Sequence, residues 1–219
     1  MTAADLPPPL LTLDALSCER DDRLLFSQLS LTASAGEIWQ VAGANGAGKT
    51  TLLRVLVGLH GFYEGEVRWQ LPGCHHRQGR DGLLYLGHRP GLRDELTALE
   101  NLRALCAIHQ QDATLLPAAL AAVGLRGFED ALVGSLSAGQ KRRVALARLW
   151  LPGKPVWVLD EPFTAIDLDG VALLEQQLRA HAAAGGLVIY TSHHRLAGDI
   201  HQVHLGAARP QVLRAGAAA

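Results

Sequence analysis

The chain has 219 residues, and its 20 lysines and arginines nearly balance 21 aspartates and glutamates, for a formal net charge of −1 at pH 7. This balance excludes a globally basic surface that would recruit nucleic acid, and the length suffices for one large or two small domains with a buried core. The three cysteines, Cys18, Cys74 and Cys106, form neither a disulfide framework nor a CxxC metal knuckle, which favours a reducing compartment.

We expect no secretory signal at the N-terminus. Residues 1–9 contain three consecutive prolines and no basic residue, so we interpret them as a frayed leader and not as a secretory signal. Every later apolar run ends well short of the roughly 18 residues that a membrane-spanning helix needs. We therefore expect a soluble chain that meets a membrane only through a partner.

The first regular elements are predicted to be strands. Apolar segments with partial alternation at residues 10–17 and 25–33 flank a charged turn at residues 19–23. Residues 65–69 alternate in the same half-buried manner. Together these segments are expected to form an antiparallel β subdomain.

A glycine-rich stretch at residues 43–50 follows the apolar run 38–42 and precedes an apolar-periodic segment that begins at Thr51. Strand, glycine-rich turn and helix is the order that predicts a phosphate-binding loop, with an ordinary glycine turn as the alternative. The glycines let backbone N–H groups wrap a polyphosphate, and the following helix adds the positive end of its dipole. In this interpretation Lys49 faces the β- and γ-phosphates of ATP and the Thr50 hydroxyl ligates Mg²⁺. The residues assigned to nucleotide binding are Gly43, Ala44, Asn45, Gly46, Ala47, Gly48, Lys49, Thr50 and Thr51.

Beyond this loop the apolar pattern changes from strand to helix and back again. Helical spacing dominates residues 92–150, which we expect to form an inserted helical subdomain, while residues 10–91 and 151–205 hold the core and the β subdomain. The tail at residues 206–219 is rich in alanine, is interrupted by proline and is expected to be loose. The further elements predicted are strands at residues 82–87, 156–159 and 187–190, and helices at residues 98–110, 113–123, 141–150 and 169–184.

An acidic pair, Asp160 and Glu161, follows directly after four apolar residues. Because the carboxyl ends of parallel strands meet in one crevice, we expect Asp160 to lie beside Thr50. Asp160 would then hold Mg²⁺, through water, and Glu161 would polarise the attacking water as a general base. A plain helix N-cap is the alternative interpretation of this pair.

Ser137 lies in the segment 136–140, which leads into the predicted helix at residues 141–150. Alone, it could be an N-cap. In combination with other motifs, however, it belongs to a pattern that resembles an ABC transporter ATPase domain over about residues 10–205. The resemblance implies a P-loop α/β core with an antiparallel β subdomain and an inserted helical subdomain, and transport-coupled ATP hydrolysis. The motifs that carry it, in order, are residues 43–50, 136–140, 156–161, 165–167 and His193.

What the resemblance implies for the site is a head-to-tail homodimer in which each ATP lies between two chains. Ser137, Ala138, Gly139 and Gln140 form the signature that meets the γ-phosphate held by the other chain. Asp167 lies at the dimer interface, and His193 contacts the γ-phosphate and orients Glu161, so that the catalytic residues are Glu161, His193 and Lys49. Groups supplied in trans can contribute about 10³- to 10⁵-fold to phosphoryl transfer, so an isolated chain is predicted to be a poor ATPase.

The chain departs from the family pattern at three positions. Ala138 replaces the usual glycine of the signature, and His88 stands where the family has the glutamine of its Q-loop. An imidazole can hydrogen-bond the attacking water and would make turnover sensitive to pH. The aromatic residue that stacks on adenine in the family falls near Arg20, whose guanidinium plane could stack on a base instead.

Four segments resemble one subgroup, the ATP-binding subunits of the bacterial cytochrome c maturation system, often called the haem exporter: residues 87–92, 95–102, 142–150 and 161–167. The resemblance implies a peripheral protein on the cytoplasmic face of the bacterial inner membrane, docked to integral membrane permease subunits near residues 88–100. Haem would be handled by those partners and not by this chain. The alternatives are the ATPase subunit of another exporter, and an ATP-driven nucleic-acid clamp; direct binding of nucleic acid is not expected.

Three weaker signals have ordinary interpretations. Cys74, His75 and His76 could bind metal or haem, but no second ligand cluster is spaced to complete a site, so we interpret them as a solvated loop. The basic run at residues 141–143 is interpreted as a solvated helix face in preference to a nucleic-acid contact. The four tryptophans lie in apolar contexts and are assigned to packing: Trp39, Trp69, Trp150 and Trp157.

Overall fold

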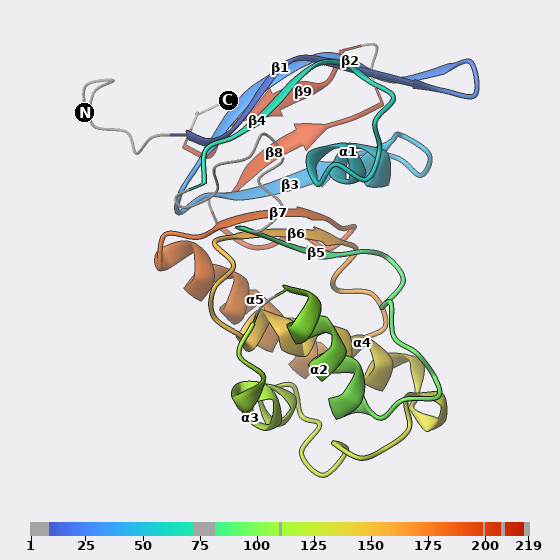
Figure 1. The fold of residues 1–219 in the computed structure, drawn as a ribbon. Helices are drawn as coiled ribbons and strands as arrows, with labels where there is room; N and C mark the ends of the chain where they lie inside the picture. Colours follow the sequence, from blue (N-terminus) through green and yellow to red (C-terminus); the bar gives the residue numbers. More distant parts are fainter. Residues whose placement is uncertain (1–8, 72–81, 110, 199, 207–208, 217–219) are drawn as a thin grey trace. The chain divides into compact units, whose positions relative to one another are not determined.

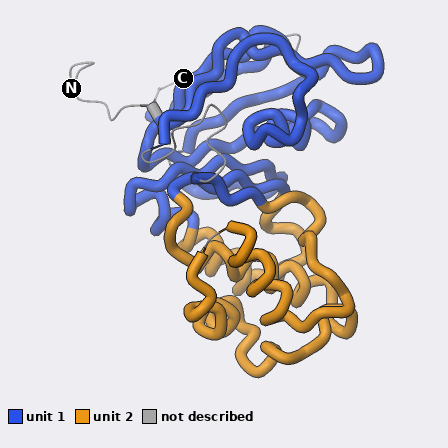
Figure 2. The backbone as a smooth tube through the Cα atoms, in the orientation of Figure 1, with its two compact units in different colours: residues 1–85, 155–160, 178–219 blue, residues 86–154, 161–177 orange. Residues whose placement is uncertain are grey.

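The computed structural model describes residues 9–71, 82–109, 111–198, 200–206 and 209–216. They form two compact units, coloured separately in Figure 2. The first unit comprises Met1–Tyr85, Pro155–Asp160 and Leu178–Ala219, and the second comprises Leu86–Lys154 and Glu161–Gln177. Residues 1–8 of the leader expected at residues 1–9 lie outside the described residues, as does the Cys74, His75 and His76 cluster, whereas Pro9 begins the first strand.

The smaller sheet of the first unit is the expected antiparallel β subdomain. It consists of β1 (Pro9–Arg20), β2 (Arg23–Ser34) and β4 (Glu64–Trp69), in the order β2-β1-β4 (Figure 1). The β1–β2 turn is shorter than the charged turn that was predicted, because Asp21 and Asp22 both have positive φ, of 52° and 56°. Positive φ at both central residues gives a two-residue turn that matches the twist of the flanking strands.

The larger sheet of the first unit has six strands in the order β5-β6-β7-β3-β8-β9. Four neighbours in the middle, β6, β7, β3 and β8, are parallel, and β9 runs antiparallel to β8. Every residue of β6 and β7 is buried, as the uninterrupted apolar runs predicted for strands that are covered on both faces. The bounds are β3 Ile38–Ala42, β5 Leu83–Leu86, β6 Val156–Asp160, β7 Leu187–Thr191, β8 His201–His204 and β9 Gln211–Leu213.

Helix α1 (Lys49–Leu56) joins the two sheets into one core. Its buried residues Leu52, Leu53, Val55 and Leu56 belong to the same apolar cluster as Leu11 from the small sheet and Val41 and Val158 from the large one. The cluster fixes the direction in which α1 leaves the loop after β3. The N-terminus of α1 is therefore held at the carboxyl end of the parallel strands.

The second unit is helical and has its own core, which contains Leu102, Leu116, Leu120 and Val144. Its elements include α5 (Leu168–Ala183), which belongs to this unit as far as Gln177. Within the described part of the chain, no helix combines the length and the apolar character that crossing a bilayer requires. The other helices are α2 Ala98–His109, η3 Ala113–Leu115, α3 Leu116–Ala122, η4 Val133–Ser135, α4 Ala138–Leu146 and η5 Ala147–Trp150.

Three expectations for the second unit differ from the structure. The unit that contains the helices also includes Glu161–Gln177, which the expected boundary at residue 150 assigned to the core. The helix predicted at residues 113–123 divides at Leu116, because the Asp112 side chain caps a separate 3₁₀ turn and a proline follows at the start of α3. The basic run at residues 141–143 is not simply a solvated face, since Arg142 is only 4% exposed.

The expectation of a loose tail at residues 206–219 is wrong for its described middle part. Gln211–Leu213 form β9 on the edge of the large sheet. Arg214 then donates through Nη2 to the Thr32 carbonyl oxygen at 2.9 Å, and its guanidinium lies 5.4 Å from the centre of the Trp39 ring. The cation of Arg214 over the aromatic ring of Trp39 holds this part of the tail against the sheet. The alanine-rich composition of the tail does not indicate this contact.

The tryptophans pack as predicted, and Trp157 contacts a half-buried histidine, His181. The ring of His181 stacks on Trp157 with 3.6 Å between centroids and 7° between planes, and its Nε2 lies 3.2 Å from the Pro155 carbonyl oxygen, to which it donates. A Cβ at Gly186 would come within 2.2 Å of Nε2, so a glycine leaves the room that the imidazole occupies. Burial lowers the pKa of His181, against a smaller raising effect of the Pro155 carbonyl.

The lowered pKa of His181 predicts how stability depends on pH. Its contribution is complete above the unfolded pKa of about 6.5 and is lost as pH falls through the lower folded pKa, because protonation then costs more in the folded chain. We expect the free energy of unfolding in urea to decrease between about pH 7.5 and pH 5. His181→Gln should have a lower stability at the upper pH but a flatter dependence. An unchanged slope in this variant would show that His181 is not the responsible group.

Candidate functional site

The glycine-rich loop lies between β3 and α1 and depends on glycine for its geometry. Gly43, Gly46 and Gly48 have φ of 147°, 79° and 95°. A Cβ at Gly43 would lie 2.6 Å from the Leu205 carbonyl oxygen, and one at Gly48 would lie 3.0 Å from Cβ of Leu25. The backbone of this loop is thus packed tightly on one side while residues 44–46 are exposed on the other.

Lys49 is the first residue of α1, and its ammonium group folds back over the loop. Nζ donates to the carbonyl oxygens of Gly43 at 2.7 Å and Ala44 at 3.2 Å. The N-cap of α1 is Gly48, which supplies no side-chain hydrogen bond to the helix. A helix N-terminus without a side-chain cap, beside a lysine, is suited to receive an anionic phosphate group.

Asp160 lies beside Thr50, as the arrangement of parallel strands predicted. The carboxylate ends β6, is 1% exposed, and accepts hydrogen bonds from Thr50 Oγ1 at 2.9 Å and from Thr191 Oγ1 at 2.7 Å. Thr191 ends β7 and is the strand partner of Asp160. Two hydroxyl groups therefore hold one buried carboxylate at the carboxyl edge of the sheet.

The donor set at Asp160 fits magnesium. Hydroxyl and carboxylate oxygens are the hard ligands that Mg²⁺ prefers, and this ion usually takes its remaining ligands from water and from substrate phosphates. Among the residues that the structure describes, no group of three or more histidine, cysteine, aspartate or glutamate side chains gathers into a self-sufficient metal site. A partial site beside a phosphate loop is the arrangement that a nucleotide-bound Mg²⁺ requires.

Tyr85, in β5, is a further polar group near this carboxylate. Burial raises the pKa of the Tyr85 phenol, and the charge of Asp160 raises it further, while a hydrogen bond and the charge of Arg54 lower it in part. The phenol therefore stays neutral at physiological pH. Asp160 supplies the negative charge at this point.

His193 lies in the loop after β7, and a buried glutamine holds the backbone on both sides of it. Gln40, in the middle of β3, is 2% exposed and donates through Nε2 to the carbonyl oxygens of Ser192 at 3.0 Å and His194 at 3.3 Å. The His193 side chain itself is exposed. The sequence analysis missed Gln40, although one polar residue in a buried apolar strand was the signal that could have identified it.

A cavity of about 130 Å³ opens beside the phosphate loop. Arg23 is the cation among the described residues that line this cavity. Its Nη1 lies 3.7 Å from the point that a Cβ would occupy at Gly46. Arg20, the residue expected near the base, instead pairs with Asp21 at 3.3 Å on the exposed hairpin end. The lining residues are Arg23, Leu24, Leu25, Phe26, Gly46, Ala47 and Gly206.

In the second unit, the signature residues form the N-terminus of α4. The Gln140 N–H donates to Ser137 Oγ at 3.2 Å, and the Ser137 N–H donates to Gln140 Oε1 at 2.9 Å, so Ser137 is indeed an N-cap. Ser137 and Ala138 are exposed, so the N-terminus of α4 is accessible to solvent despite the methyl group of Ala138. A Cβ at Gly139 would lie 2.8 Å from the Ala165 carbonyl oxygen, which explains the glycine.

The same helix contacts the other predicted site residues of this unit. Arg143 pairs with Asp167, which also accepts the Gly170 N–H at 3.0 Å; the Gly170 bond and then the Arg143 bond lower the pKa of Asp167. Arg142 donates to the carbonyl oxygens of Gly87, which precedes His88, and of Glu161. Lys49, Thr50, Asp160 and His193 thus belong to the first unit, and Glu161, Asp167, His88 and the signature to the second.

The family model described as ABC transporter matches residues 26–164 of this chain. The chain belongs to this family. Membership makes it an ATP-binding protein and an ATPase, as the motifs predicted. The phosphate loop, the signature and the acidic pair all lie within the matched residues.

Relatives extend the match to nearly the whole chain. The "Cytochrome c biogenesis ATP-binding export protein CcmA" of Alcanivorax borkumensis is 63% identical, over 96% of this chain and 94% of the relative. The protein of the same name from Methylococcus capsulatus is 53% identical, over 88% of this chain and 96% of the relative. The subgroup that the sequence motifs indicated is therefore confirmed.

Solved structures show the same fold. The "Structure of ATP binding subunit of ABC transporter" matches with a TM-score of 0.79 at 24% identity, over 93% of this chain and 90% of that one. The "Dimeric structure of a post-hydrolysis state of the ATP-binding cassette MJ0796 bound to ADP and Pi" matches with a TM-score of 0.78 at 22% identity, over 93% and 99% of the two chains. The predicted P-loop α/β fold with its β and helical subdomains is confirmed.

The cavity beside the loop predicts which arginine contributes to nucleotide affinity. Arg23→Ala should raise the KM for ATP about tenfold, because a charged contact to a nucleotide contributes on the order of 1.5 kcal/mol. Arg20→Ala is the matched control on the same hairpin and should change KM by less than about twofold. Steady-state ATP hydrolysis measures both. A larger effect at Arg20 than at Arg23 would contradict the assignment.

Proposed function

We propose that this chain is the ATP-hydrolysing subunit of a transporter complex for cytochrome c biogenesis, acting as a homodimer that drives integral membrane permease subunits. The ATPase part is supported by the buried Asp160 carboxylate bonded to Thr50 beside a phosphate loop. The observation that carries the cytochrome c part is the 63% identity over 96% of the chain to a relative named for that role. A peripheral position on the cytoplasmic face of the bacterial inner membrane follows from such a partnership.

On binding, the triphosphate of ATP lies along residues 43–51. The Lys49 ammonium leaves the carbonyl oxygens of Gly43 and Ala44, which it contacts in this structure, and faces the β- and γ-phosphates. Thr50 and, through water, Asp160 are the residues that would hold Mg²⁺. The bound ion supplies positive charge that offsets the charge of the phosphates.

Hydrolysis requires a base and a second charge-stabilising surface. Glu161, next in the chain to Asp160, polarises the attacking water, and His193 hydrogen-bonds the γ-phosphate and orients Glu161. Residues 137–140 of a second chain present the exposed tip of α4 to the same phosphate, where the helix N-terminus favours negative charge. Because part of the site comes from the second chain, turnover depends on dimerisation.

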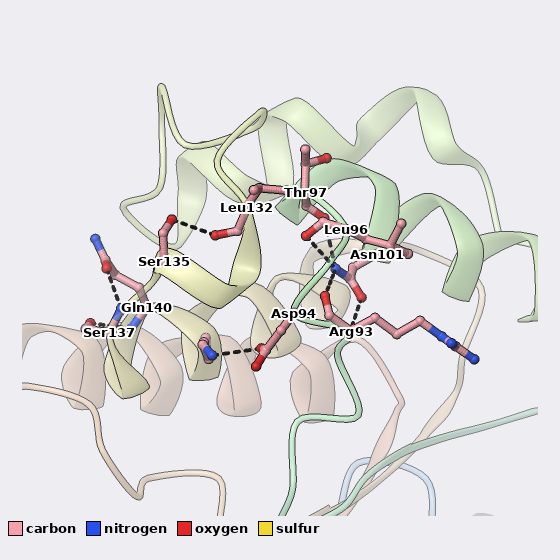
Figure 3. Close-up of polar contacts among 10 residues, drawn as sticks. Arg93, Asp94, Leu96, Thr97, Asn101, Leu132, Ser135, Ser137 and Gln140 are labelled. Atoms are coloured by element: carbon pink, nitrogen blue, oxygen red, sulfur yellow. Dashed lines mark hydrogen bonds and ion pairs between the residues drawn. The ribbon is translucent and has the colours of Figure 1, made fainter.

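The segment ahead of α2, the proposed docking place for the permease, is tied to the signature helix (Figure 3). Asn101 Oδ1 accepts the Arg93 N–H at 2.8 Å, and its Nδ2 donates to the carbonyl oxygens of Arg93 at 3.0 Å and Thr97 at 2.9 Å. Asp94 pairs with Lys141 of α4 at 2.8 Å. A partner that displaced this segment would therefore also displace the N-terminus of α4, which carries Ser137. His88 lies at the start of the segment between β5 and α2.

The chemistry of this chain favours partners as the handlers of haem. The residues of the proposed site are suited to binding phosphate, which supports assigning haem to the partners. An exporter of another cargo is the second candidate, because it would share every contact described above. A nucleic-acid clamp is less favoured, since two of the three basic residues of the run 141–143 pair with carboxylates.

Replacing the proposed base separates binding from hydrolysis. Glu161→Gln should lower ATP turnover by about 100-fold or more, as expected for loss of a general base, and should trap an ATP-bound dimer. Size-exclusion chromatography with saturating ATP and Mg²⁺ measures the dimer. Adding Lys49→Ala to the same chain should abolish both the trapping and the turnover. A Glu161→Gln chain that stays monomeric at saturating nucleotide would contradict the proposal.

Isolation of the native complex tests the cargo. We expect a tagged chain, purified from membranes in detergent, to bring down a permease and a component with haem absorbance in the Soret region. A different permease without that absorbance would favour the second candidate. Salt-sensitive retention of nucleic acid would favour the clamp instead.

A further inference from the structure

Arg142, on the signature helix α4, is a buried cation whose acceptors include three main-chain carbonyl oxygens. Its side chain is 4% exposed. Nη2 donates to Glu161 O at 2.6 Å, Nη1 donates to Gly87 O at 3.1 Å, and Nε donates to Pro162 O at 3.4 Å. One guanidinium thus joins three segments of the second unit: the signature helix, the residue before His88 and the start of the chain after Asp160.

This geometry uses what is particular to arginine. A guanidinium is planar, remains charged and presents N–H groups in fixed directions, so it can bind several carbonyl oxygens at once. A lysine at this position would keep the charge but concentrate its donors on one atom. A buried charge is costly without such bonds, so the guanidinium and the carbonyl oxygens that accept from it hold each other in position.

The backbone at Glu161 is held in an uncommon conformation. Its φ is 50°, in the left-handed region that residues with a Cβ seldom adopt unless their surroundings impose it. The Glu161 carbonyl oxygen accepts from Arg142 and also from the Thr164 N–H at 3.2 Å. Both bonds fix the orientation of this peptide group, and the direction of the Glu161 side chain follows from its backbone.

We infer that Arg142 is a positioning residue for hydrolysis: it holds the Glu161 backbone in the left-handed conformation that aims the carboxylate, and it ties this conformation to the signature helix and to the peptide before His88. The inference rests on the proposed role of Glu161 as the base. Arg142 contacts no nucleotide atom in this account and acts through Glu161 alone. Its loss therefore slows the hydrolytic step and leaves ATP binding in place.

The test compares Arg142→Gln and Arg142→Lys with a matched control, Arg148→Gln. Arg148 is a second buried arginine of the same unit, 5% exposed, and has no role in the proposed site. For both Arg142 variants we expect kcat to fall about tenfold or more while the KM for ATP changes by less than about twofold, the pattern of a lost transition-state interaction. Arg148→Gln should retain kcat, with its effect confined to the thermal unfolding midpoint.

A second arm places Arg142→Gln in the Glu161→Gln chain and measures single-turnover hydrolysis. Residues that act through one group are not additive, so the second substitution should cause no further loss. An equal fold-loss in both backgrounds, a full kcat in Arg142→Lys, or a loss matched by Arg148→Gln would each overturn the inference. Wild-type turnover in Glu161→Gln would instead overturn the proposed base, which distinguishes the two failures.

Discussion

The carboxylate of Asp160 is held by two hydroxyl groups that come from segments far apart in the chain. Thr50 lies in the first turn of the helix after the phosphate loop and Thr191 ends the neighbouring strand, and each donates to a different oxygen of a side chain that is 1% exposed. A buried charge is tolerated only with such partners, so the loop, β6 and β7 must meet in this one arrangement. Lys49, next in the chain to Thr50, and the segment of His193, which follows Thr191, are thereby brought to the same edge of the sheet.

In the second unit, helix α4 connects the predicted site residues, as Asp160 does in the first unit. The run of three basic residues on α4 pairs with Asp94 toward the proposed docking segment, with the backbone at Glu161, and with Asp167. The exposed tip of this helix carries Ser137, where an N-terminus favours a phosphate. A partner that moves the docking segment, a phosphate at the tip and the proposed base are thus connected through contacts of one element. In the proposed function, this helix therefore contributes to the link between ATP and transport as much as the phosphate loop does.

The sequence predicted the parts of the site that follow local rules. Apolar runs located β6 and β7, and the rule for parallel strands brought Asp160 to Thr50 across 110 positions. It could not reveal Arg142, because a basic run has the same composition whether it is solvated or buried. It also missed β8 and β9, because only Val203 of His201–His204 is buried and the alternation is too short to register. Gln40 left only the signal of one polar residue in an apolar strand, and Arg23 lines the cavity through a tertiary contact that no local pattern encodes.

The central claim, that each ATP is hydrolysed between the loop of one chain and the signature of another, is tested most directly by mixing two inactive variants. Lys49→Ala lacks the loop function, whereas Ser137→Asp keeps an N-cap but places a negative charge against the phosphate. Each alone should be nearly inactive, and an equimolar mixture should recover about a quarter of wild-type ATP turnover, since half of random dimers contain one intact site of two. A mixture no more active than its separate components would contradict the account.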